Sequence, residues 1–588
     1  MAIVFQLLLN LVEVFLTDKL AGTLAVPGKT DLVIRAMLDR GIGFAAAIGI
    51  AADVVLLRQS ARTQITQLTN LMFDLSDAFF QRLLRHGHRV QILAYRAENR
   101  HRNGPVLSDS LVKLSAMRAE NSQITFADLE FLQQGIRLDP LLEKISGFLA
   151  DHDELVELVR CDLERGLKEP ETGRPGLTPD QVLRSLILMR IKNWDYRELR
   201  ERINDGYTLR KFTGFYSQPV PQHNAFNQAF NRLTSTTVER LNDAIVEAAV
   251  DDGLEDGSKL RADTTVVETN IHWPTDATLL WDTVRVLTRL IGRLRDIVPK
   301  DVPRFANRKR AARRRMQKLQ RMTASQRESQ QVSTYKQLLA ITQEVLTNAR
   351  RTLKATAQSR GKTPTDILAL EELRQDLTEY CSLGDRVVDQ ARRRVLGGEQ
   401  VPTSQKLYSI FEPHTDLIKR GKINKPIEFG HKIFLAESAQ GLVTQYHVLD
   451  GNPSDEDHVE SSLKAHRKTF GSVPEVFATD RGFDNADNQK TCRKARIGCA
   501  SIPQRGGKKT AERQAFEKSP DFKKAQRFRA GIEGRISVLF RGRGMKRCLA
   551  HGKERFCVFI GVAVLANNLM KIAEFLIRRE TKKKPRAA

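Results

Sequence analysis

The stretch KLRADTTVVETNIHWPTD, residues 259–276, contains a β-type run that is rich in Thr and Val. β-Branched residues pack well on a pleated sheet, so this composition predicts a strand over residues 259–269. Asp263 lies near the start of that strand, although the chain around it is strongly basic. A carboxylate in a strand of a basic protein is a candidate functional residue, and we expect its partners elsewhere in the sequence.

The charge balance of the chain indicates a polyanionic partner. The protein has 588 residues, of which 41% are hydrophobic and 28% are charged, and its net charge is +25. A chain of this length is expected to form about two to four domains. A positive charge of this size most often serves nucleic-acid binding, although a solvated basic surface is the plainer alternative. The clustering of the cations along the chain favours nucleic acid.

The six cysteines carry neither a disulfide nor a zinc signature. They are scattered, without a C-x-x-C pair or a close cluster with His. Free thiols fit a reducing cytoplasm, which is the location that we expect.

No segment is predicted to cross a membrane. The apolar run at 42–57 is shorter than the ~20 residues that a spanning helix needs, and it contains Asp53. A second apolar run, 555–577, is interrupted by Asn567 and Asn568, and we expect it to be a core helix.

The beginning of the chain fits the remainder poorly. Residues 1–116 are interpreted as an uncertain N-terminal extension. One hypothesis is that Met117 is the true start, because a charged, helical pattern begins near it. Residues 117–170 are predicted to form a helical segment.

Residues 171–245 are predicted to form a helical DNA-binding domain. Thr178 is a candidate N-cap, with Gln181 three residues later in the pattern of a capping box. Short helices follow, and the arrangement resembles a helix-turn-helix. The helix expected at 219–235 carries amide side chains that suit contacts with bases and phosphates: Asn224, Asn227 and Gln228. An ordinary polar helix face is the alternative.

Residues 276–405 are predicted to form a helical, basic insertion. Apolar side chains from Leu280 to Val298 recur in alternate steps of four and three residues, as in a coiled-coil seam. The segment also contains a dense run of cations: Arg308, Lys309, Arg310, Arg313, Arg314 and Arg315. We expect this run to follow a DNA backbone, and a solvated charged arm is the alternative.

Two further carboxylates occupy positions that suit a catalytic site. Asp480 ends the apolar run EVFATD, and active-site residues of sheet proteins lie at such strand ends. Glu533 lies on a basic helix, four residues after Arg529, so that the two side chains share one face. Residues 255–275 and 427–577 together are therefore predicted to form an α/β, mixed-sheet catalytic core.

Three converging carboxylates repel one another unless cations bind among them. Mg²⁺, or Mn²⁺ in its place, takes oxygen ligands, and two such ions about 4 Å apart can promote phosphoryl displacement. We predict that Asp263, Asp480 and Glu533 are the catalytic residues and hold two metal ions. The alternative is that each has an ordinary structural role, with Glu533 only pairing with Arg529.

Four motifs resemble the bacterial insertion-sequence DDE transposases. They are RADTTVVETNIHWPTDATLLWD, FEPHTDLIKRGKINKPIEFGHK, ATDRGFDN and the R-x-x-x-E of RAGIEGR. The closest group has a long helical insertion between the first and second catalytic aspartates. The resemblance covers about residues 117–577. It implies a ribonuclease-H-like catalytic core, an all-α N-terminal DNA-binding region and DNA strand transfer with Mg²⁺.

The resemblance also bears on residues around the carboxylates. Arg529 and Arg535 would contact DNA phosphates. Related transposases often carry Tyr and Lys where this chain has Gln526 and Phe540, so that the auxiliary phosphate contacts of that Tyr and Lys do not carry over to this chain. In some relatives an aromatic side chain stacks on a flipped base, a role open to Trp273, for which packing in the core is the alternative.

The function predicted from these features is that of a DNA transposase, an enzyme of DNA recombination encoded by a mobile element. It would cut the ends of an insertion sequence and join their 3′-OH groups to double-stranded target DNA. Two ends must be joined in one complex, so that a homodimer is expected. The alternatives are a metal-dependent nuclease without strand transfer and an inactive, DNA-binding remnant. We expect the protein in the bacterial cytoplasm, with the nucleoid, and ending in a basic tail at 578–588.

Overall fold

The computed structural model describes residues 116–117, 126–133, 135–167, 174–419 and 426–583. The chain divides into two compact units, Met1–Val106 and Leu107–Ala588. All described residues belong to the second unit. The predictions for residues 1–115 and for the end of the basic tail therefore lie outside the described residues.

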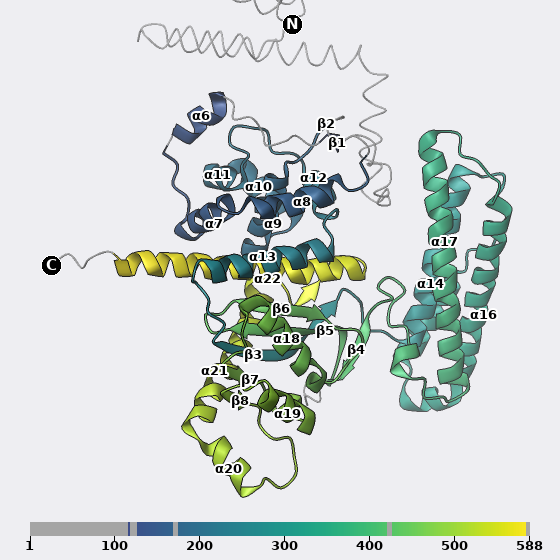
Figure 1. Cartoon of the computed structure of the whole chain (residues 1–588). Helices are drawn as coiled ribbons and strands as arrows, with labels where there is room; N and C mark the ends of the chain where they lie inside the picture. The colour runs from purple at the N-terminus through teal and green to yellow at the C-terminus, as the bar shows by residue number, and fades with distance from the viewer. Residues whose placement is uncertain (1–115, 118–125, 134, 168–173, 420–425, 584–588) are drawn as a thin grey trace, which may run out of the picture. The chain divides into compact units, whose positions relative to one another are not determined.

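The strand predicted around Asp263 is β3 (Lys259–Thr269), and it lies inside a seven-stranded mixed sheet (Figure 1). It runs antiparallel to β5 (Ile427–Ser438) and parallel to β7 (Val476–Ala478) and β9 (Arg547–Cys548). The outer strands are β4 (Asp416–Lys419) and β6 (Val443–Val448), which pair with β5, and β8 (Cys499–Ser501), which pairs with β7. The sheet and its covering helices fit the predicted α/β core.

Helices cover both faces of the sheet. Side chains of neighbouring residues in a strand point to opposite faces, and apolar side chains on each face pack against helices. On one face, Leu260 and Phe434 share a core with residues of α18 and α19. On the other face, Val267 and Leu435 share a core with residues of α21 and α22. The helices and turns of this part are η5 (Asp455–His458), α18 (Val459–Phe470), η6 (Arg481–Phe483), α19 (Ala486–Lys494), α20 (Ala511–Lys518), α21 (Pro520–Gly542) and α22 (Lys553–Lys583).

The part of the chain that precedes β3 is mainly helical where it is described. Thr178 caps its helix as predicted, since its side chain accepts from the Gln181 amide and Gln181 bonds back to the Thr178 backbone. The helix predicted over 219–235 is shorter, because Pro219 and Pro221 hold the chain extended before it begins. The elements are β1 (Ala116–Met117), α6 (Phe126–Gln133), α7 (Pro140–Ala150), α8 (Asp153–Glu164), β2 (Arg174–Pro175), α9 (Pro179–Lys192), α10 (Tyr196–Asp205), α11 (Tyr207–Thr213), α12 (His223–Phe230) and α13 (Ser235–Asp251).

Helix α22 is a core helix, as predicted for the apolar run at 555–577. Within the described part of the chain it is the one helix long and apolar enough to cross a membrane, and most of its apolar window is buried. It contacts α7, α9 and α13 as well as β6 (Figure 1). Asn568 explains one polar interruption, because its side chain exchanges two 2.9 Å hydrogen bonds with the Val443 backbone. The other, Asn567, accepts from Arg535 at 3.1 Å.

Four helices occupy the segment between β3 and β4 that was predicted to be a helical insertion (Figure 1). The apolar residues from Leu280 to Val298 are buried in the shared core of this bundle, which explains their spacing. The elements are α14 (Asp276–Ile297), α15 (Lys309–Arg321), α16 (Ala324–Thr356), α17 (Pro364–Ala391), a π-turn at Arg392–Leu396 and a 3-10 turn at Thr403–Gln405.

A buried polar network joins the end of this segment to the sheet. The rings of His414 and His431 are stacked, and Nδ1 of His414 lies 2.7 Å from Nε2 of His431. Glu412 contacts the far nitrogen of His414 at 2.8 Å, and Asp416 contacts the far nitrogen of His431 at 3.0 Å. A carboxylate therefore contacts each end of the imidazole pair, and the network connects the segment before β4 to β5.

Candidate active site

The pairing register of two strands brings the first two predicted carboxylates together. β3 and β7 are parallel, and Arg261 pairs with Ala478. Asp263 and Asp480 each lie two residues beyond this pair, so that they are neighbours at the end of β7. Oδ1 of Asp480 accepts from the Gly482 amide at 2.8 Å and thereby caps the turn η6. Within the run EVFATD the strand itself is only β7, which ends at Ala478 before the capped turn.

Arg529 lies between all three predicted carboxylates. Its Nη2 atom is 2.8 Å from Oδ2 of Asp263 and 3.7 Å from Oδ2 of Asp480. Its Nη1 atom is 2.9 Å from Oε1 of Glu533, whose side chain is 69% exposed. The structure therefore gathers the three acids around one guanidinium. The i,i+4 pair that was the alternative reading of Glu533 is also present.

Asp263 lies in a desolvated position. The pKa of its carboxyl is raised to about 6, mainly by burial and also by the nearby Asp480 and Asp455, against the opposing effects of Arg529 and the Thr264 amide. A carboxylate that burial destabilises in this way gains most from a cation beside it.

The donor chemistry of the site fits Mg²⁺ or Mn²⁺, which take carboxylate oxygens. The geometry is that of a guanidinium site, however, because Arg529 lies between the acids. No cluster of three or more His, Cys, Asp or Glu side chains in the described residues is arranged to hold a metal ion. Binding of a metal ion here requires Arg529 to move.

A fourth carboxylate, Asp455, lies beside the site and was missed in the sequence. Thr264, the residue after Asp263, donates its hydroxyl to Oδ1 of Asp455 at 2.7 Å. Lys432 on β5 forms a 2.7 Å ion pair with the same oxygen. Asp455 begins the short turn η5, in the polar stretch GNPSDED, and no strand end marks it in the sequence, so that only its contacts with Thr264 and Lys432 identify it.

Arg535, predicted to contact phosphate, lies in a different environment. Its side chain is 10% exposed, and its Nε atom is 2.8 Å from Oε1 of the fully buried Glu437. This ion pair occupies the guanidinium and argues against a phosphate contact.

The residues predicted to bind DNA outside the core lie on exposed helix faces. Asn224, Asn227 and Gln228 are exposed on α12. On α15, Arg310, Arg313 and Arg314 are exposed. Arg308, just before α15, is also exposed but pairs with Glu344 at 3.0 Å. Lys309 and Arg315 are half-buried, and Arg315 bonds to Gln337 at 3.3 Å. Their contacts with DNA stay predictions.

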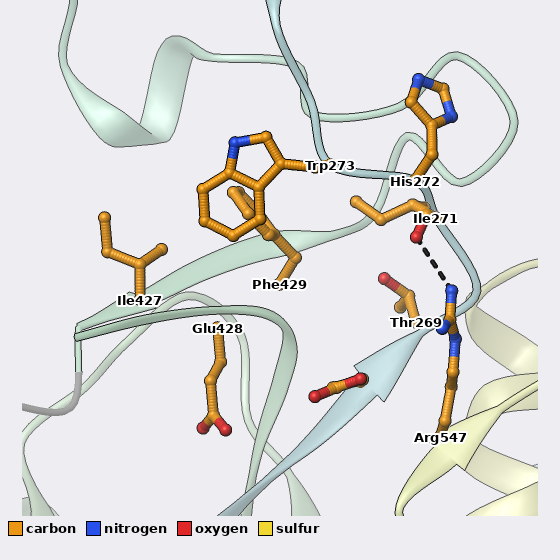
Figure 2. A pocket seen from close by; sticks show the side chains of 9 residues that line it. Thr269, Ile271, His272, Trp273, Ile427, Glu428, Phe429 and Arg547 are labelled. Atoms are coloured by element: carbon orange, nitrogen blue, oxygen red, sulfur yellow. Dashed lines mark hydrogen bonds between the residues drawn. The ribbon is translucent and has the colours of Figure 1, made fainter. Parts of the chain in front are cut away.

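Trp273 is exposed, so that the alternative of core packing is wrong. Its side chain is 67% exposed, and its ring meets that of Phe429 edge-on at 5.2 Å. Figure 2 shows the two rings beside a pocket that Arg547 also lines, with Arg547 donating to the Ile271 carbonyl at 2.9 Å. The pocket is lined by Glu268, Thr269, Ile271, His272, Trp273, Ile427, Glu428, Phe429 and Arg547. An exposed aromatic ring in such a pocket can stack on a planar group.

Comparison with known proteins gives one family match. Residues 131–232, which include α9 to α12, match the family described as "Transposase domain (DUF772)". No curated protein and no solved structure matches the chain. The match supports a transposase-family protein, which is a DNA-processing enzyme expected to bind DNA. It ends before β3 and therefore says nothing of the three carboxylates.

Proposed function

We propose that the protein is a DDE-type DNA transposase of an insertion sequence, which cuts the element ends and joins their 3′-OH groups to target DNA. The observation that carries this proposal is the convergence of Asp263, Asp480 and Glu533 on one cation in a strongly basic chain. The family match at 131–232 supports it from a separate part of the chain. The mixed sheet, with Asp263 on an inner strand, is consistent with a ribonuclease-H-like core.

In this proposal Asp263 and Asp480 hold two Mg²⁺ or Mn²⁺ ions, and Glu533 holds one of them. Bound metal would lower the pKa of the attacking water and stabilise the leaving oxygen. Arg529 leaves its position between the acids and contacts a DNA phosphate, for which a guanidinium fork is well suited. The exchange explains how an acidic site functions in a protein that attracts DNA.

The exposed helix faces have separate roles in the proposal. The amide side chains of α12 contact the terminal repeats of the element, and the arginines of α15 contact the DNA backbone. Trp273 stacks on a base that leaves the duplex. Two element ends require two active sites, so that the active complex is a homodimer in the bacterial cytoplasm, at the nucleoid.

The test uses pre-cleaved element ends, a target plasmid and Mg²⁺. Joined products support strand transfer, whereas cleavage of intact ends without any joining would leave a nuclease. Asp263→Ala is expected to abolish both reactions and to keep the affinity for DNA. Cleavage that persists in Asp263→Ala, or in EDTA, would contradict the three-carboxylate site. A wild-type chain that binds DNA but does not cleave it would support the alternative of an inactive, DNA-binding remnant.

A further inference from the structure

Glu437 is a fully buried carboxylate held between two arginines. Its Oε2 atom accepts from Nε of Arg261 at 2.8 Å, and its Oε1 atom accepts from Nε of Arg535 at 2.8 Å. The two arginine side chains are only 12% and 10% exposed. Charges removed from water in this way are retained only with close, directional partners.

The arginines belong to the two elements that carry the candidate active site. Arg261 lies two residues before Asp263 on β3, and Arg535 lies two residues after Glu533 on α21. Arg261 also donates from Nη1 to the carbonyl of Phe528 at 2.6 Å, and Phe528 immediately precedes Arg529. The cluster therefore connects the strand of Asp263 directly to the helix of Arg529 and Glu533.

A glycine on α21 provides the space that this connection needs. A Cβ atom at Gly531 would lie 2.1 Å from Nη1 of Arg261. An exposed arginine would turn away at little cost, but this guanidinium is held by Glu437 and by the Phe528 carbonyl. Gly534, one turn further along α21, has nothing within 4 Å of the corresponding position.

We propose that Arg261, Glu437 and Arg535 are positioning residues that set the distance and rotation of α21 against β3. The inference rests on the proposed function, because its consequence is the placement of Glu533 and Arg529 relative to Asp263. Apolar contacts alone allow a helix to slide on a sheet, whereas hydrogen bonds to a shared carboxylate define one position. Displacements near 1 Å are enough to disturb a catalytic constellation.

The test compares Gly531→Ala with Gly534→Ala in the full chain. Both changes replace a helical glycine by a better helix former, so that Gly534→Ala should maintain or raise the unfolding temperature when measured without metal. In Gly531→Ala the displaced Arg261 guanidinium offsets this gain, so that its unfolding temperature should lie below that of Gly534→Ala. Gly531→Ala is expected to lower kcat for DNA cleavage at least tenfold and to change KM for DNA far less, because the exposed faces of α12 and α15 that are proposed to bind DNA are untouched. Gly534→Ala is expected to keep the wild-type kcat.

Calorimetric titration of Mn²⁺ into the DNA-free protein gives a readout besides activity. Gly531→Ala is expected to weaken Mn²⁺ binding several-fold, and Gly534→Ala is not. Arg261→Lys removes the atom that meets the new methyl group, so that its loss in kcat and that of Gly531→Ala should not add in the double variant.

Equal kcat and equal Mn²⁺ affinity in the two glycine variants would overturn the inference and leave the proposed function intact. Additive losses in the double variant would also overturn it, because the two changes would then act separately. A wild-type chain that neither cleaves DNA nor binds Mn²⁺ would overturn the proposed function, and with it this inference.

Discussion

Arg529 on α21 is joined to Asp263 on β3 by a 2.8 Å ion pair whose two side chains are 16% and 14% exposed. The pair spans 266 positions of the sequence and closes the acidic site with a cation of the protein itself. A desolvated acid needs a cation nearby, and Arg529 supplies it when no metal does.

Arg529→Ala is expected to lower the free energy of unfolding by about 2 kcal/mol in EDTA, because it leaves the acids without a cation. Mg²⁺ should then raise the unfolding temperature of this variant more than that of the wild type. Thermal unfolding with and without Mg²⁺ measures both effects. Arg527→Ala, at an exposed neighbour on the same helix, is the control and should behave as the wild type. Identical Mg²⁺ shifts in all three proteins would contradict the exchange of Arg529 for metal.

His466 on α18 should contribute to acid lability. Burial lowers the pKa of its imidazole from 6.5 to about 4, so that the folded state disfavours the protonated ring. The unfolded chain then binds the extra proton between these pH values, and stability that is complete above pH 6.5 falls as the pH approaches 4. The free energy of unfolding lost through His466 over this pH range is about 3 kcal/mol. Urea unfolding of His466→Leu from pH 7 to pH 4 should show a shallower decline than the wild type, and parallel curves would disprove this assignment.

Trp273→Ala tests whether the exposed ring contacts DNA. The ring is 67% exposed, so its removal should change the free energy of unfolding by less than about 1 kcal/mol. If the ring stacks on a base, DNA affinity should fall by about 1–3 kcal/mol, measured by fluorescence anisotropy with labelled element ends. Trp273→Phe should keep part of the affinity. Unchanged binding in both variants would remove Trp273 from the DNA interface.

The exposed arginines of α15 are expected to bind DNA through their charge, without regard to its sequence. Changing Arg310, Arg313 and Arg314 together to Gln should weaken binding to all DNA sequences alike. The slope of log K against log salt concentration should become shallower by about 0.9 for each phosphate contact that is lost. A slope equal to that of the wild type would indicate that this run is only a solvated face.

The amide side chains of α12 are expected to recognise the DNA sequence of the element ends. Changing Asn224, Asn227 and Gln228 together to Ala is expected to reduce discrimination between element ends and unrelated DNA while the salt slope stays unchanged. Competition binding at one fixed salt concentration measures the ratio of the two affinities. A uniform loss for both DNAs would favour an ordinary polar face with no readout of bases.

Sequence patterns within short stretches were sufficient to predict several elements of the fold. β3 spans the predicted 259–269, because β-branched residues favour a strand wherever it is placed. Thr178 and Gln181 form the predicted capping box, since a cap depends on residues three apart. The three candidate acids could be selected because each stands at a recognisable place on a strand, a strand end or a helix face.

Contacts between distant segments could not be predicted in the same way. In the sequence, nothing distinguishes Glu437 from other carboxylates in predicted strands. Only the packing of β3 and α21 against β5 shows that it accepts from two arginines. Asp455 joins the site through Thr264 and Lys432, which come from two other strands.

The exposure of Trp273 and the burial of Arg535 likewise depend on which surfaces meet. Propensity, capping and strand alternation act over a few residues and can be read along the chain. The position of a charge relative to its partners and to water is set by packing between segments that lie far apart in the sequence.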